Sequence, residues 1–142
     1  MSYNLAVLPK PPTIVDLIWT GRLEFAANLS KSALIIDSAG ETGPSPVEAL
    51  GAAVAGCMSV DVAHILTKGR HEFRALRARL VADRSPDDPH RFVHVALSFI
   101  IEGDVPREAI ERALQLSRDK YCSVWHSMRQ DIDLRVTFEL VA

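Results

Sequence analysis

The sequence has few cysteines, little net charge and no long uninterrupted apolar run, and each shortage excludes a class of protein. Its 142 residues contain two cysteines, Cys57 and Cys122, which are too few and too far apart for a disulfide framework or a cysteine zinc site. The 16 Lys and Arg residues against 18 Asp and Glu residues give a net charge of −2, which does not favour nucleic acid or an anionic membrane surface as a partner. We recognise no signal peptide, so we expect a cytoplasmic protein with reduced thiols and no bound metal.

The composition is that of one globular domain. Hydrophobic residues make up 48% of the chain and charged residues 24%, which is enough apolar material to fill a core at this length. Three prolines between residues 9 and 12 predict that residues 1–12 form an extended lead-in. We therefore expect a single domain over residues 13–142.

The longest apolar stretch, residues 45–68, has the pattern of a buried helix. Ser45 is a good N-cap, Pro46 suits the first helical position, and Glu48 completes an S-x-x-E capping box. Apolar side chains then recur at helical spacing, at Val47, Leu50, Val54, Met58, Val62, Ile65 and Leu66. Gly69 directly after this stretch is a suitable helix terminator.

Small residues surround the remainder of this helix and predict a close neighbour. Gly51 and Gly56 each cost about 1 kcal/mol relative to alanine, so another backbone should gain from approaching them. A chain this short does not enclose an all-round apolar helix by itself, which predicts an obligate homodimer. Ser59, Asp61 and His64 interrupt the apolar surface and argue against a membrane-spanning helix.

The remaining elements follow from alternation and turn residues, and their order predicts an α+β fold rather than a parallel α/β sheet. We expect strands at 13–20, 21–27 and 32–37 before the long helix, with a loop at 38–44. After it we expect two antiparallel strands, a helix from about Pro106, a break near Asp119, a short helix and a final strand. These later strands cover 76–83, 93–101 and 132–140, and the short helix runs from Lys120 to about Asp131.

Three motifs surround the two cysteines. They are P-S-P-x-E-A-L-x-A-A-x-A-G-C-x-x-x-D-V at 44–62, R-F-x-H-x-x-L-x-F at 91–99 and A-L-x-L-S-x-x-K-Y-C-S-V at 113–124. With these motifs the chain, from about residue 13 to its end, resembles the OsmC/Ohr family, and within that family its YhfA-like branch. The resemblance implies an OsmC-like fold in which two long central helices pack between curved antiparallel sheets of an intertwined homodimer.

The resemblance also implies a chemistry, the thiol-dependent reduction of organic hydroperoxides in oxidative-stress defence. Cys57 would be the peroxidatic cysteine and Cys122 the resolving one. Members of the family use a glutamate and an arginine to hold the reactive thiolate; Glu48 matches the glutamate, and Arg22 is the sole arginine before the long helix. No cofactor is implied, and an external dithiol, such as a thioredoxin-like or lipoyl reductant, would reset the enzyme.

The residues themselves leave the roles of the two cysteines open. Cys57 lies about three turns into its helix, beyond the useful reach of the helix dipole, so it needs a nearby guanidinium to ionise. Cys122 stands at an expected helix N-terminus beside Lys120, and both features favour a thiolate. On this ground alone Cys122 would be the peroxidatic residue. The plain alternative is that both are small buried hydrophobic residues.

Glu48 and the polar residues of the long helix also have structural interpretations. Glu48 and Cys57 fall on opposite faces of an ideal helix, about 13 Å apart along its axis, so they meet only through a partner helix or a rearranged loop. Cys57 and His64 are about 10 Å apart along the axis, too far for a catalytic triad with Asp61. We therefore expect Asp61 and His64 to form a polar pair within the helix or at the dimer interface.

Four further apolar side chains are expected in the core, with lining of an apolar substrate mouth as the alternative: Trp19, Phe25, Trp125 and Met128. Together these observations favour a two-cysteine peroxidase. The alternative is a non-enzymatic OsmC-like dimer that binds a small molecule or responds to redox state.

Overall fold

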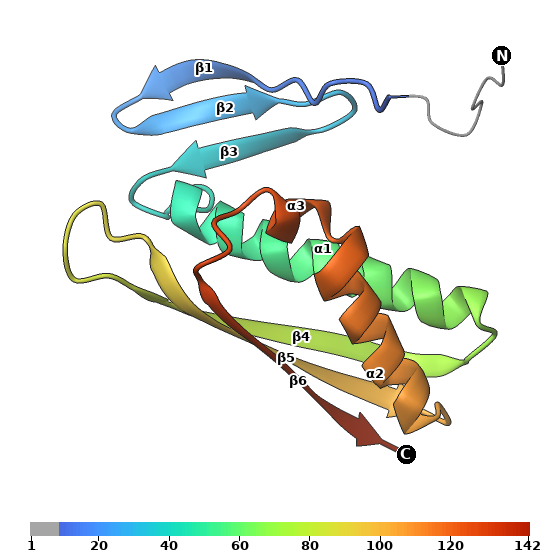
Figure 1. Ribbon diagram of the computed structural model, residues 1–142. Coiled ribbons are helices and arrows are strands. Elements are labelled where there is room, and N and C mark those ends of the chain that lie inside the picture. Colours follow the sequence, from blue (N-terminus) through green and yellow to red (C-terminus); the bar gives the residue numbers. More distant parts are fainter. Residues whose placement is uncertain (1–8) are drawn as a thin grey trace, which may run out of the picture. The chain divides into compact units, whose positions relative to one another are not determined.

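The computed structural model describes residues 9–142, and its contacts divide the chain into two compact units (Figure 1). One unit ends at Ala49 and the other comprises Leu50–Ala142, so each is described by itself. Helices and sheets are mixed in the predicted order, which confirms the α+β fold. The single domain over 13–142 stays a prediction, and most of the expected lead-in lies outside the described residues.

The first unit carries a three-stranded antiparallel sheet in the order β1-β2-β3. Its strands are β1 (Asp16–Gly21), β2 (Glu24–Asn28) and β3 (Ala33–Asp37), close to the expected ranges. The β1–β2 turn places Arg22 in the left-handed region, with φ 48°. Leu17 pairs with Ala27 and Trp19 with Phe25, so these apolar residues share one face of the sheet.

That apolar face is largely exposed in this chain. Trp19 is 64% exposed and Leu17 59%, whereas Ala27 is 3% exposed. Phe25 is also exposed. The expectation that Trp19 and Phe25 belong to the core is therefore wrong for the chain as described.

Helix α1 (Pro46–Lys68) begins and ends where the sequence predicts. The Ser45 N–H donates to Glu48 Oε1 at 3.1 Å, and the Glu48 N–H donates to Ser45 Oγ at 3.2 Å, which is the expected capping box. At the other end, the Gly69 N–H donates to the Ile65 carbonyl. Although α1 has the length and mean hydropathy of a membrane-crossing helix, many core helices share these properties, and 28% of its apolar window is buried.

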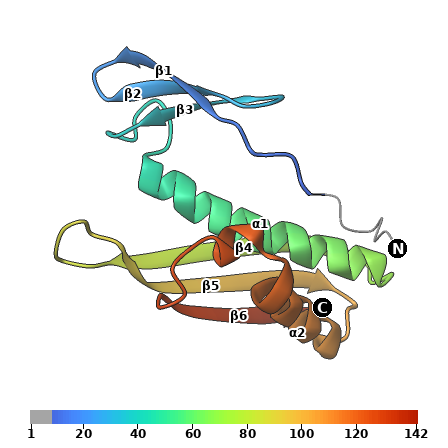
Figure 2. The same ribbon diagram turned by 45° about the horizontal axis from the view of Figure 1, so that its top comes forward.

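The second unit is built on a sheet with the order β4-β5-β6. Strands β4 (Phe73–Arg84) and β5 (Phe92–Gly103) pair antiparallel, as expected, while β6 (Asp133–Val141) pairs parallel to β5. Figures 1 and 2 show α1 running along one face of this sheet. The core contains alternate residues of β5 and one stripe of α1: Val95, Leu97, Phe99, Ile101, Val54, Met58, Val62 and Leu66.

Helix α2 (Arg107–Leu116) crosses back from β5 to β6 and buries Ile110, Ala113 and Leu114. It continues as a five-residue π-helical turn, η1 (Ser117–Tyr121), and then as a single helical turn, α3 (Ser123–His126). The expected helix from Lys120 to Asp131 is therefore wrong in extent. One cause is Gln130, whose side-chain amide donates to the carbonyls of Trp125 and Met128 and so satisfies the backbone where a helix would continue.

Candidate active site

The second unit brings the two cysteines together beside a carboxylate. The Sγ atoms of Cys57 and Cys122 and a carboxylate oxygen of Asp61 all lie within 4.8 Å of one another. Both cysteines are free thiols; Cys57 is half-buried and Cys122 is fully buried. Two thiols at this separation need a small approach to form a disulfide.

Each group reaches the site from a different local structure. Cys57 and Asp61 are four residues apart on α1, which places them on the same face of the helix. Cys122 ends the π-helical turn: its N–H donates to the Ser117 carbonyl at 2.8 Å, five residues back. Its backbone then turns extended, with ψ 97°. Such π-turns are frequent at functional sites because they redirect a side chain without ending the helical path.

Ser117 fixes the carboxylate. Its side chain is fully buried, and its Oγ donates to Asp61 Oδ2 at 2.8 Å. Within the chain, the expected pair of Asp61 with His64 is thus replaced by a partner 56 residues further along the sequence, and His64 is exposed. Sequence reasoning missed Ser117, although this serine stands inside the motif around Cys122, five residues before it.

Burial controls the protonation of Cys122. Desolvation, with smaller contributions from the neighbouring Cys57 and Asp61, raises its pKa from 9.0 to about 11. The Trp125 N–H, which donates to the Cys122 sulfur at 3.3 Å, acts in the opposite direction and lowers this pKa. The expectation that Cys122 ionises readily is therefore wrong. Helix α3 has four residues and so a negligible dipole, and Lys120 is exposed, its ammonium 5.3 Å from the ring of Tyr121.

The two thiols consequently differ in what they can do. Cys122 is held as a thiol, because burial and the neighbouring Cys57 and Asp61 raise its pKa. A small molecule reaches Cys57 because that residue is partly open to solvent, whereas Cys122 is enclosed. This asymmetry suits Cys57 as an accessible nucleophile and Cys122 as a second thiol that is protected from solvent.

Arg22 and Glu48 belong to the first unit, where each has a local structural role. Arg22 is exposed at the β1–β2 turn, and its carbonyl accepts a hydrogen bond from Trp19 Nε1 at 2.8 Å. Glu48 is exposed in the capping box, and its Oε1 lies close to Gly40 in the preceding loop. Glu48 thus acts as a helix cap, which is one of its two interpretations.

The loop that carries Gly40 is held by Asp37. This buried carboxylate accepts the N–H groups of Ala39, Glu41 and Thr42, and these bonds keep its pKa below the usual range. The loop is therefore a built structure rather than a loose connection.

The same three groups could also surround an ion, since one ligand atom from each of Cys57, Asp61 and Cys122 lies within 4.8 Å of the others. A thiol that coordinates a metal loses its proton, so the raised pKa of Cys122 describes the metal-free site. That site carries two free thiols at a separation suited to thiol chemistry.

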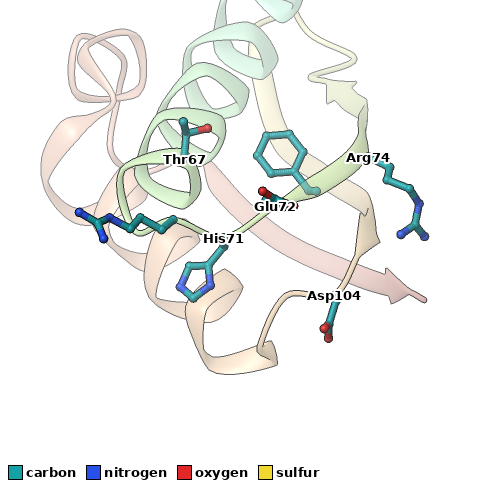
Figure 3. A pocket seen from close by; sticks show the side chains of 7 residues that line it. Thr67, His71, Glu72, Arg74 and Asp104 are labelled. Atoms are coloured by element: carbon teal, nitrogen blue, oxygen red, sulfur yellow. The ribbon is translucent and has the colours of Figure 1, made fainter.

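A hollow of about 800 Å³ lies elsewhere, between the end of α1 and the start of β4 (Figure 3). Figure 3 shows His71, Glu72, Arg74 and Asp104 pointing in different directions rather than toward one point. Without convergent polar groups this hollow does not resemble a binding site, and Thr67 on its rim is about 15 Å along α1 from Cys57.

Comparisons with known proteins agree with this fold. A family model described as OsmC-like protein matches residues 38–137. Protein YhfA of Escherichia coli K12 is 34% identical over 127 residues, which is 87% of this chain and 95% of YhfA. The structure of a hypothetical protein from Aquifex aeolicus VF5 superposes with a TM-score of 0.85 at 27% identity, covering 92% of this chain and 97% of that one. An organic hydroperoxide resistance protein from Legionella pneumophila has a TM-score of 0.67 at 14% identity, with coverage of 91% and 97%.

Proposed function

The chain belongs to the OsmC-like protein family, and from this membership we propose that it is a thiol-dependent peroxidase that reduces organic hydroperoxides. The observation that carries the proposal is the asymmetric thiol pair, with Cys57 half-buried and Cys122 fully buried within 4.8 Å of each other. The family resemblance alone does not fix the activity, since family members share a fold more readily than a chemistry. The proximity and unequal burial of the two thiols support the peroxidase activity in particular.

The reaction has three steps. The Cys57 thiolate attacks one peroxide oxygen, the O–O bond breaks, and the alcohol leaves while Cys57 becomes a sulfenic acid. Cys122 then attacks the Cys57 sulfur, so that an S–S bond forms and the S–OH oxygen leaves as water. An external dithiol, thioredoxin-like or lipoyl in type, reduces the disulfide and restores both thiols. The protein needs no cofactor for these steps.

The burial of Cys122 supports its assignment as the resolving cysteine. A fully buried thiol does not meet a peroxide in solution, so it stays reduced while Cys57 reacts. Once Cys57 is a sulfenic acid, the proximity of Cys122 closes the disulfide before a second peroxide overoxidises Cys57. The proximity of Cys122 therefore protects Cys57 from overoxidation.

We further propose that the protein acts as a homodimer. On α1, Val60 is 67% exposed, and a Cβ added to Gly56 would meet nothing within 4 Å, so this apolar face is uncovered in one chain. A second copy of this chain offers the same apolar helix, and two such faces cover each other. In that arrangement Glu48 and Arg22 of one copy are the groups that hold the Cys57 thiolate of the other, which reconciles their distance along the helix with the family's chemistry.

Rapid mixing of reduced protein with cumene hydroperoxide and with hydrogen peroxide tests the activity. We expect fast loss of the Cys57 thiol, faster with the organic peroxide, and one Cys57–Cys122 disulfide per chain in non-reduced digests read by mass spectrometry. Cys57→Ser should abolish the reaction. Cys122→Ser should stop at the sulfenic acid and then overoxidise. Thiols that are inert to both peroxides would overturn the proposal.

The contributions of Arg22 and Glu48 need their own variants. Arg22→Ala should slow the first step by at least about tenfold at pH 7, because an opposite charge within ~4–6 Å shifts a pKa by 1–3 units. Arg22→Lys should recover part of the rate. Glu48→Gln keeps the capping box and removes the charge, so it separates the cap from the site. Arg79→Ala, an exposed arginine on β4, is the matched control.

The alternative function is a binding protein that keeps the fold and both thiols but turns over slowly. The local role of Arg22 at the β1–β2 turn favours this alternative, since a turn residue need not serve a thiolate. Coincident rates for the parent and the three variants, all slow, would support it.

A further inference from the structure

Asp61 is an acidic group beside the two thiols, and the three-step scheme gives it no role. It is half-buried and lies with both sulfurs within 4.8 Å, and a fully buried serine donates to one of its oxygens. A carboxylate next to a thiolate is unfavourable for the first step, because like charges repel. Its presence therefore calls for a different explanation.

The second step of the proposed reaction has a proton problem. Cys122 must lose its proton to attack the Cys57 sulfur, yet burial holds Cys122 in the thiol form, with a pKa of about 11. The resting enzyme needs this protonated state, which keeps Cys122 unreactive. The resolving step needs the opposite, so an acceptor has to be present inside the site.

We propose that Asp61, oriented by Ser117, is the proton acceptor that activates Cys122 in the resolving step. This inference rests on the proposed function and deepens it. The Ser117 Oγ–H occupies Asp61 Oδ2, which leaves the second carboxylate oxygen for the thiol proton. Asp61 is the carboxylate that the described site offers, since Glu48 is engaged in the cap of α1.

The step balances without another reactant. Cys122 S–H gives its proton to Asp61, the Cys122 sulfur attacks the Cys57 sulfur, and the S–O bond breaks as the S–S bond forms. The proton passes from Asp61 to the departing hydroxide, which leaves as water, and the carboxylate is regenerated. The Cys57 sulfur is reduced by one electron and the Cys122 sulfur is oxidised by one.

The titratable groups that bear on Cys122 are few. Cys57 and Asp61 face it from α1, while Lys120, in the segment before it, is exposed beside Tyr121. A transfer from Cys122 to Asp61 is internal, so its rate is independent of pH while Asp61 is ionised and Cys122 is protonated. Without Asp61 the rate depends on the fraction of Cys122 that is a thiolate. At pH values below the pKa of the thiol, this fraction rises tenfold for each unit by which the pH increases.

A disulfide reagent tests this step without any peroxide. Reduced protein mixed with 5,5′-dithiobis(2-nitrobenzoate) should release one thionitrobenzoate when Cys57 attacks and a second when Cys122 displaces the first adduct, and both are followed at 412 nm. In Asp61→Asn we expect the second phase to slow at least about tenfold at pH 7, while the first phase is not slowed. Its rate should then rise about tenfold per pH unit between pH 6 and 8, against a flat profile in the parent.

Controls separate proton transfer from a structural effect. Asp119→Asn, an exposed acid in η1, should leave both phases unchanged, and Cys122→Ser should remove the second. In Asp61→Ala, added formate should restore the second phase in a saturable manner, which a merely structural residue would not show. Ser117→Ala keeps the charge and loses its orientation, so we expect a smaller slowing, about threefold.

The outcomes are distinct from those of the peroxidase test. A second phase with unchanged rate and pH profile in Asp61→Asn, or no formate rescue in Asp61→Ala, overturns the inference. If Asp61→Asn does not fold, an unchanged second phase in Ser117→Ala overturns it instead. A protein that is inert to peroxide but shows these reagent phases loses the proposed function and keeps the role of Asp61.

Discussion

The two three-stranded sheets of this chain have similar apolar patterns and opposite environments. On β5 of the second unit, Leu97 and Phe99 are at most 1% exposed, whereas on β1 of the first unit Trp19 is 64% exposed. In each strand the apolar residues two positions apart share one face, and β1 is also apolar on its other face, at Ile18. The comparison teaches that an apolar strand face identifies a surface that is to be buried and does not say which molecule buries it.

The difference follows from what each unit supplies. Strands β4 and β5 are 12 residues long, and α1 and α2 cover their apolar face within the same unit. The strands of the first sheet have five or six residues, and the described residues 9–45 supply loops and no helix to cover them. Under the dimer proposed above, the first sheet is an interface and the second is a core.

The largest effect is expected in the core. Phe99→Ala should lower the free energy of unfolding by about 3–5 kcal/mol, because it removes a fully buried aromatic side chain and leaves a cavity. Urea denaturation measures it, with Ser98→Ala on the exposed side of the same strand as control. A loss below about 1 kcal/mol would mean that the second sheet is no better packed than the first.

The next effect tests whether the exposed face of the first sheet is an interface. Replacing Leu17 and Trp19 by alanine should weaken the dimer by at least about 2 kcal/mol, or roughly 30-fold in Kd, as hot-spot residues do. Ile18→Ala, 58% exposed on the opposite face, is the matched control. Sedimentation over a concentration series distinguishes the two, and an unchanged dimer in the double variant would remove this face from the interface.

A smaller effect is expected at the thin surface of α1. A Cβ at Gly56 meets nothing within 4 Å, so Gly56→Ala in an uncovered helix should stabilise by about 1 kcal/mol. If a second helix crosses there, that gain disappears. We expect thermal melting to show no gain in stability for Gly56→Ala.

Gly51→Ala is the control for that measurement. Its Cβ makes an ordinary contact of 3.5 Å with Leu80 in the same chain, which also means that a leucine at Gly51 would overpack one chain and report nothing about a dimer. A full gain of about 1 kcal/mol in Gly56→Ala would contradict a close crossing at this point.

The smallest effect is a pH dependence inside the core. Folding raises the pKa of Cys122 from 9.0 to about 11, so the folded state favours the neutral thiol. Its contribution to stability is fully present below about pH 9 and is lost as the pH rises toward 11. The loss at pH 9 should be under about 1 kcal/mol, and Cys122→Ala should flatten the urea-denaturation profile between pH 8 and 10. An identical slope in both proteins would contradict the burial of this thiol.

Local signals made most of the fold predictable. The capping box of Ser45 and Glu48, the stop at Gly69 and the alternation of β4 and β5 are short-range patterns, and the structure confirms each. The parallel pairing of β6 with β5 was not predicted, because a strand's own residues do not reveal the direction of its neighbour.

The site was predictable only in part for the same reason. The cysteines could be named from motifs, but the bond between Ser117 and Asp61 joins residues 56 positions apart and depends on how α1 packs against η1. The acidity of Cys122 was misjudged because a helix N-terminus and a nearby lysine are visible in sequence, whereas burial is not.

The π-helical turn η1 also explains how Ser117 and Cys122 serve one site although they are five residues apart. In a regular α-helix, five residues at about 100° each would place the two side chains about 140° apart. A π-turn is in effect an α-helix with one residue added, so it absorbs the extra residue and keeps both side chains on the side that faces α1. Relatives with one residue fewer between the equivalents of Ser117 and Cys122 would then close this turn as a regular α-helix and still keep the two side chains together.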